Sequence, residues 1–158
     1  MSVQNDIVET VKKYLSENKA EAVVVASQGG KSAMKMAEAL GKESKIIAVC
    51  EFAYSENVNK ALKKAKVTVV EKANLPIQDV REMRETLMMF DPGIKAALEV
   101  ASIAASSKLV TGKYIAVAGS GKGLDTAIVV NTTHPEAEEI SEPLKHLKVE
   151  KILASPLI

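Results

Sequence analysis

The chain has 158 residues, 47% of them hydrophobic and 26% charged, which is typical of one globular domain over residues 1–158. The formal charge of +1 excludes the strong basic field that recruits nucleic acid, and 3% aromatic residues exclude a base-stacking surface. A single cysteine excludes an intrachain disulfide and a multi-cysteine zinc site, and two histidines alone do not make a metal site, so no metal is expected.

Membrane and export signals are missing from the sequence pattern. No apolar run approaches the roughly 18 residues of a spanning helix, and the first residues lack the charged-then-apolar order of a signal peptide. We therefore expect a soluble cytoplasmic protein with no membrane partner.

The first 70 residues alternate between helical and strand-like segments. Helical spacing of apolar residues predicts helices over 5–18 and 32–40 and a third around 58–65. Short apolar runs predict strands at 22–26, 46–50 and 67–70, and their lack of alternation indicates burial on both faces. This rhythm predicts a parallel sheet with right-handed crossovers, in which these three strands and 114–118 are central.

The pattern changes after residue 70. Apolar spacing predicts a helix over 76–90, with Val80, Met83, Leu87 and Phe90 in one stripe. Asp91 should cap a second helix over 92–107, which is apolar on nearly all sides. Strands are expected at 114–118 and 125–130. The six-residue link between them is too short for a parallel crossover, so the pair should be antiparallel, with an edge segment at 149–154.

A glycine-containing turn, SQGGKS at 27–32, lies between a predicted strand and a helix. Two glycines let the backbone approach a ligand, the helix N-terminus favours an anion, and Lys31 adds a full positive charge. The turn is therefore either a phosphate cradle or a simple link in which Ser32 caps the helix.

A second such turn, GSGKG at 119–123, follows the strand at 114–118, and could be a flexible hairpin or a second wall of the same pocket. Neither turn is a nucleotide-triphosphate loop, because Val25 and Ala116 occupy the positions of its first glycine. The dinucleotide fingerprint also fails, although Glu51 stands where a ribose-binding acid could lie.

Three stretches together carry a family resemblance. They are AVVVASQGGKSAMKMAEALGKESKIIAV (22–49), MMFDPGIKAALEVASIAA (88–105) and YIAVAGSGKGLDTAIVV (114–130). The first resembles the start of the C-terminal domain of pyruvate kinase. All three resemble the small stand-alone archaeal and bacterial proteins classed as pyruvate kinase C-terminal-domain-like. The resemblance covers residues 5–154.

The resemblance implies an α/β fold, a three-layer sandwich with a mostly parallel sheet and an antiparallel edge. It also implies bound flavin mononucleotide (FMN) and no pyruvate kinase activity, since the catalytic barrel is missing. The segment EKANLP (71–76) is shorter than in relatives, which removes any contact made by their longer insert. By resemblance, a set of residues in the two turns would bind or enclose the phosphorylated ligand: Ser27, Gln28, Gly29, Gly30, Lys31, Ser32, Gly119, Ser120, Gly121, Lys122, Gly123, Asp125 and Thr126.

Several other side chains have two readings. Glu99 either pairs with Lys95 along the helix or is a buried carboxylate bonded near the second turn. Phe52 and Tyr54 follow the second strand, and each either stacks on a planar ligand ring or packs locally. Cys50 is expected in the core, and His134 and His146 at the surface.

The sequence thus predicts a stand-alone binding or regulatory domain for a phosphorylated small molecule, FMN or a sugar phosphate. The alternative is a small flavin-dependent or phosphate-transferring enzyme. The turns offer Lys31, Lys122 and Asp125 but no histidine as a general acid or base, which favours binding. No nucleic acid is expected as a partner, and a homo-oligomer is left open.

Overall fold

A computed structural model describes residues 3–41, 43–119, 123–140 and 147–158. The helices are α1 (Val3–Glu17), α2 (Lys31–Leu40), α3 (Glu56–Lys64), α4 (Arg81–Met88), α5 (Pro92–Ser106) and a short 3₁₀ helix (Pro135–Glu139). The strands are β1 (Ala22–Ala26), β2 (Lys45–Val49), β3 (Thr68–Val70), β4 (Lys113–Ala118), β5 (Thr126–Asn131) and β6 (Lys148–Ala154).

The strands form one mixed sheet in the order β3-β2-β1-β4-β5-β6. Strands β3, β2, β1 and β4 run parallel to one another. Strands β4 and β5 are antiparallel, as the short link between them predicts, and β6 adds a second antiparallel pair at the edge. The expected α/β class, with a mostly parallel sheet and an antiparallel edge, is confirmed.

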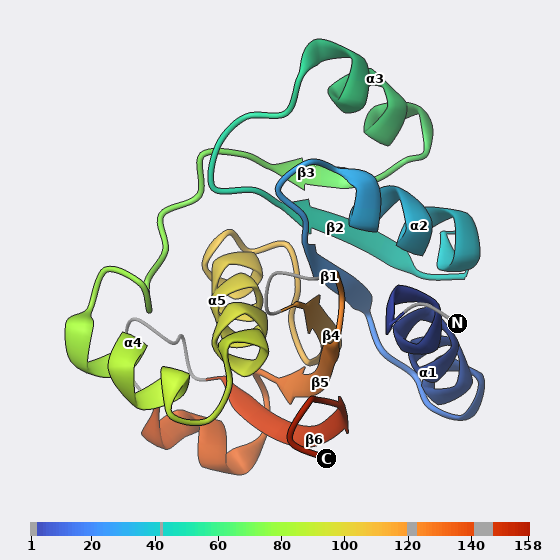
Figure 1. Cartoon of the computed structure of the whole chain (residues 1–158). Coiled ribbons are helices and arrows are strands. Elements are labelled where there is room, and N and C mark those ends of the chain that lie inside the picture. Colours follow the sequence, from blue (N-terminus) through green and yellow to red (C-terminus); the bar gives the residue numbers. More distant parts are fainter. Residues whose placement is uncertain (1–2, 42, 120–122, 141–146) are drawn as a thin grey trace.

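Helices cover both faces of this sheet and make three layers (Figure 1). Alternate residues of β1 point to opposite sides: Val23 and Val25 join the core under α1, α2 and α3, whereas Ala22 and Val24 join the core under α5. Burial on both faces explains why the central strands are continuous apolar runs.

Helix α5 begins as the sequence predicts. The Asp91 carboxylate accepts hydrogen bonds from the Gly93 N–H at 2.8 Å and the Ile94 N–H at 3.2 Å, and Pro92 occupies the first helical position. The helix then crosses β1, β4 and β5. The Tyr114 hydroxyl on β4 donates to the Ala101 carbonyl of α5 at 2.7 Å, which joins helix and sheet inside the core.

The helix expected over 76–90 is wrong in its first turn. Residues 76–80 form turns, and α4 begins only at Arg81. The backbone N–H groups of Ile77 and Gln78 donate to the Glu99 side chain, so this tertiary bond replaces the first helical turn. The expected apolar stripe is not a core face either, since α4 buries no residue fully and Phe90 is 60% exposed.

No helix in the described part of the chain is both long and apolar enough to cross a membrane.

Strand β3 was expected in the centre of the sheet, but it is a three-residue edge strand with half-buried side chains. Amides of β1 and β4 should therefore exchange with solvent deuterium most slowly, since both strands are hydrogen-bonded on two sides and buried on two faces. Amides of β3 should exchange faster. Hydrogen-exchange mass spectrometry measures this order, and rapid exchange across Ala22–Ala26 would contradict the central position of β1.

Candidate functional site

The two glycine turns meet where the strand order reverses. From β1 the chain moves outward through β2 to β3, then returns across the other face by α5 to pair β4 with β1. The turns after β1 and β4 leave the same carboxyl edge of adjacent parallel strands. Ligands of open α/β sheets bind at such a switch point, because the connections diverge there and leave a crevice.

Hydrogen bonds to buried groups hold the first turn in place. The buried Ser27 donates its N–H to the Val49 carbonyl at 3.1 Å, and its Oγ accepts from the Ala33 N–H at 3.3 Å. Ser27 therefore satisfies one of the first N–H groups of α2. The Tyr54 hydroxyl donates to the Ser27 carbonyl, which ties the turn to the loop after β2.

Gly30 lets this turn enter α2. It precedes the helix with φ +89°, a left-handed conformation that favours glycine. A Cβ built there would lie 2.5 Å from Cγ1 of Val58 on α3, whereas one built at Gly29 would meet nothing within 4 Å. Gly30 is thus packed into the core, while Gly29 faces open space.

The turns line an open cavity of about 240 Å³, here called the turn cavity. From the first turn and its strand it is lined by Ala26, Ser27, Gln28, Gly29, Lys31 and Ser32. From the second it is lined by Gly119, Gly123 and Leu124. A Cβ at Gly119 would lie 1.8 Å from the Gly123 carbonyl oxygen, so the two ends of the second turn touch. Ser120, Gly121 and Lys122 lie outside the described residues.

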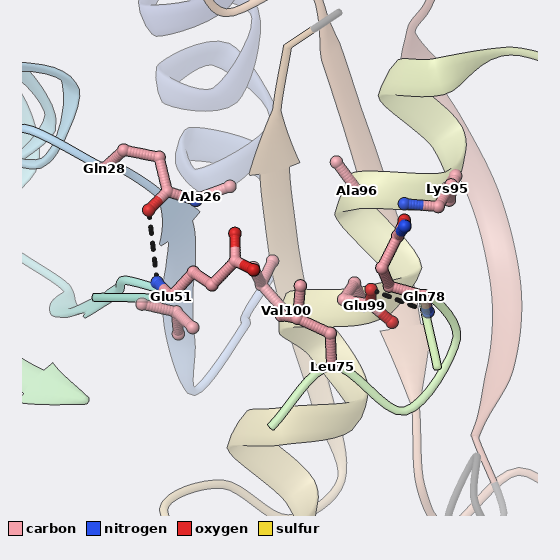
Figure 2. Close-up of a pocket in the computed structure, with 10 residues that line it drawn as sticks. Ala26, Gln28, Glu51, Leu75, Gln78, Lys95, Ala96, Glu99 and Val100 are labelled. Atoms are coloured by element: carbon pink, nitrogen blue, oxygen red, sulfur yellow. Dashed lines mark hydrogen bonds between the residues drawn. The ribbon is translucent and has the colours of Figure 1, made fainter. Parts of the chain in front are cut away.

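A second cavity of about 280 Å³, the strand-end cavity, adjoins the first and shares Ala26 and Gln28 with it. Figure 2 shows the strand ends on one side and α5 with the turn at 76–80 on the other. Its remaining lining is apolar from Val49, Leu75, Ala96 and Val100, and polar from Glu51, Gln78, Lys95 and Glu99.

Gln28 lies between the two cavities and is held in place. Its side-chain oxygen accepts from the Glu51 N–H at 3.1 Å and, more weakly, from the Cys50 thiol at 3.6 Å. The same thiol lies 3.4 Å from the Gln28 carbonyl oxygen. Burial raises the pKa of the Cys50 thiol, and the side chain lies in the core, as expected.

Glu99 is a buried carboxylate, only 4% exposed, as one of its two readings anticipates. Its partners are not in the second turn, however. It accepts from the Ile77 N–H at 2.6 Å and the Gln78 N–H at 3.1 Å. Burial raises the pKa of Glu99, while these bonds and nearby Lys95 oppose the rise, and Asp79 adds to it.

Besides Gly30, which is packed into the core, three predicted ligand residues do not line the turn cavity. Phe52 is 67% exposed and lines neither cavity of the described residues, and its neighbour Tyr54 packs locally under Gly30. Thr126 donates to Asp125 at 2.8 Å, and a Cβ on Gly93 at the start of α5 would touch both side chains. The structure thus brings Asp125 and Thr126 to α5 and not into the cavity.

Metal ligation has no support in the described residues, which contain no group of three or more histidine, cysteine, aspartate or glutamate side chains that could hold an ion. His134 caps the 3₁₀ helix through Nδ1, which accepts from the Glu136 N–H at 3.1 Å, and His146 lies outside the described residues.

Comparison with models of known protein families and with curated proteins finds no match to this chain. The resemblance to the pyruvate kinase C-terminal domain therefore stays a prediction from motifs.

Replacing Gly30 by alanine should destabilise the protein by about 1–3 kcal/mol, since it forces a side chain into positive φ and against Val58. The matched variant Gly29→Ala should unfold close to the wild type. Chemical denaturation of both variants measures the difference. Equal stabilities would show that the first turn is not pinned at Gly30.

Replacing Glu99 by glutamine should destabilise the protein by about 1–3 kcal/mol, because the amide can accept only one of the two buried N–H groups well. The raised pKa means that the folded state binds the Glu99 proton more tightly than the unfolded chain. This contribution to stability is complete below the ordinary carboxyl pKa and is lost as pH rises through the raised value.

The stability difference between wild type and Glu99→Gln should therefore be largest on the acid side and shrink as pH rises. Urea titrations of both proteins at several pH values measure it. A difference that grows with pH would mean that the two N–H bonds, and not burial, dominate the titration of Glu99.

Proposed function

We propose that this protein is a binding or regulatory domain that holds a phosphorylated small molecule, FMN or a sugar phosphate, with its phosphate in the turn cavity. The observation that supports this most strongly is the meeting of two glycine turns, far apart in sequence, around one cavity at the switch point of the sheet.

The electrostatics of the turn cavity suit an anion. The N-terminus of α2 opens on it, and Lys31 is the ionisable side chain among its described lining residues. A helix N-terminus contributes ~1 kcal/mol to a bound anion, and each charge-assisted hydrogen bond adds about 1.5–3 kcal/mol before ordering costs. Once the ordering costs are subtracted, these contributions give weak binding of free phosphate, so the rest of the ligand must supply affinity and specificity.

The strand-end cavity gives the rest of the ligand a place. It continues from the turn cavity at Ala26 and Gln28. Val49, Leu75 and Val100 give it apolar surface against which a flavin ring or the carbon face of a sugar could pack, a contact that exposed Phe52 does not supply.

A phosphate-transferring role has less support. Phosphate transfer needs an acid or base beside the reacting phosphate. The described lining of the turn cavity supplies only Lys31 for this purpose, and a lysine that interacts with a phosphate serves first to bind it.

Replacing Lys31 by alanine should weaken FMN binding by roughly tenfold or more, since it removes the full charge beside the phosphate. Ser32→Asp should weaken it further, because it places a carboxylate at the same point. Riboflavin, which lacks the phosphate, should lose much less affinity in both variants. Fluorescence titration with FMN and riboflavin measures these changes, and glucose 6-phosphate with glucose forms the sugar pair.

Lys19→Ala is the matched control, because Lys19 is exposed in the loop before β1, at the opposite edge of the sheet. It removes the same charge from the protein and should leave all four affinities unchanged. Equal losses for the phosphorylated and unphosphorylated member of each pair, or no loss in either, would show that the phosphate does not lie in this turn.

A further inference from the structure

The adjoining cavities differ in charge. Lys31 makes the described lining of the turn cavity positive, whereas the strand-end cavity has two carboxylates, Glu51 and Glu99, against one ammonium group, Lys95. A single molecule that spans both would meet positive charge at one end and an excess of acidic groups at the other.

Only one of the two carboxylates is left for a ligand. Both oxygens of Glu99 accept backbone N–H groups, and Lys95, one helical turn away, interacts with it electrostatically. The Glu51 carboxylate, in contrast, makes no hydrogen bond or ion pair with any described residue. Figure 2 shows it reaching from the end of β2 into the space before α5.

The backbone of Glu51 is fixed although its side chain is exposed. Its N–H donates to the Gln28 side chain at 3.1 Å, and Gln28 lines both cavities. The carboxylate therefore projects from a point anchored to the wall that the two cavities share. A ligand long enough to pass Gln28 would place one group at Glu51 and its phosphate beside Lys31.

We propose that the ligand is a phosphomonoester with an amino group at its other end, and that Glu51 binds this ammonium group. The proposal rests on the phosphate site of the proposed function and adds the second contact point, which favours a sugar phosphate that carries an amine over FMN, which has no amino group. A carboxylate suits an ammonium group better than a neutral hydroxyl, because the charged hydrogen bond is the stronger one. A ligand that carries a carboxylate in place of the amino group would be repelled by Glu51.

Glucosamine 6-phosphate and glucose 6-phosphate test this, since they differ only by an ammonium group in place of a hydroxyl. O-phosphoethanolamine and ethyl phosphate form a second pair with a shorter distance between amine and phosphate. Isothermal calorimetry near neutral pH should show a preference of about three- to tenfold for the amine in at least one pair, a modest value because Glu51 is exposed.

Glu51→Gln should remove that preference while leaving the affinity for the neutral member of the pair nearly unchanged. Glu43→Gln is the matched control: Glu43 is exposed in the turn before β2, at the opposite edge of the sheet, so the preference should persist. Lys31→Ala should weaken both members of the pair by a similar factor.

The possible failures are distinct. A preference that survives Glu51→Gln, or no preference in either pair, overturns the assignment of Glu51 while binding that depends on Lys31 still supports the phosphate site. Loss of dependence on Lys31 overturns the phosphate site itself. If none of the four compounds binds at millimolar concentration, the amine proposal is wrong, and the FMN titration decides the phosphate site separately.

Discussion

After β3, the chain must return to the edge of β1 that β2 leaves free, where β4 pairs. It does so across the opposite face of the sheet from α2 and α3. Right-handed crossovers that run in opposite directions from one point must lie on opposite faces. After β1 the chain leads through α2 to β2, whereas after β4 it turns back into β5 on the other side, so the two connections diverge. Both cavities lie at this place, so the topology positions the candidate site before any particular side chain does.

Within this crevice the first turn gains rigidity from the core beneath it. Ser27 is hydrogen-bonded through its N–H, carbonyl and hydroxyl, and Gly30 packs against Val58 with no room for a side chain. A cradle fixed in this way loses little conformational freedom when an anion binds, which lowers the ordering cost that otherwise opposes binding. The buried Tyr54 thus acts on the site as a support for the turn, which is the local packing that the sequence offered as an alternative to a ligand ring contact.

The sequence predicted those features that local pattern determines. Burial on both faces makes the runs at 22–26 and 114–118 continuously apolar, the link of six residues requires an antiparallel pair, and Asp91 with Pro92 defines the start of α5. Features set by distant contacts were missed. The edge position of β3 depends on strand order, and the turn at 76–80 depends on a carboxylate about 20 residues away. The sequence could not decide whether Glu99 pairs with Lys95 or is buried, because spacing along a helix gives no information about what faces it.

The strand-end cavity shows how such distant contacts shape the site. Glu99 holds the N–H groups of Ile77 and Gln78, and Arg84 of α4 donates to the Gln78 carbonyl at 2.6 Å, so Gln78 is fixed from two helices. Across the cavity, Gln28 is fixed by Glu51 and Cys50. Gln78, anchored through its backbone, and Gln28, anchored through its side chain, thus lie on opposite walls of the cavity. A buried carboxylate is costly unless hydrogen-bonded, and here that same bonding positions the wall of a cavity. The hydrogen bonds that make the burial of Glu99 affordable in free energy are therefore the same bonds that shape the strand-end cavity.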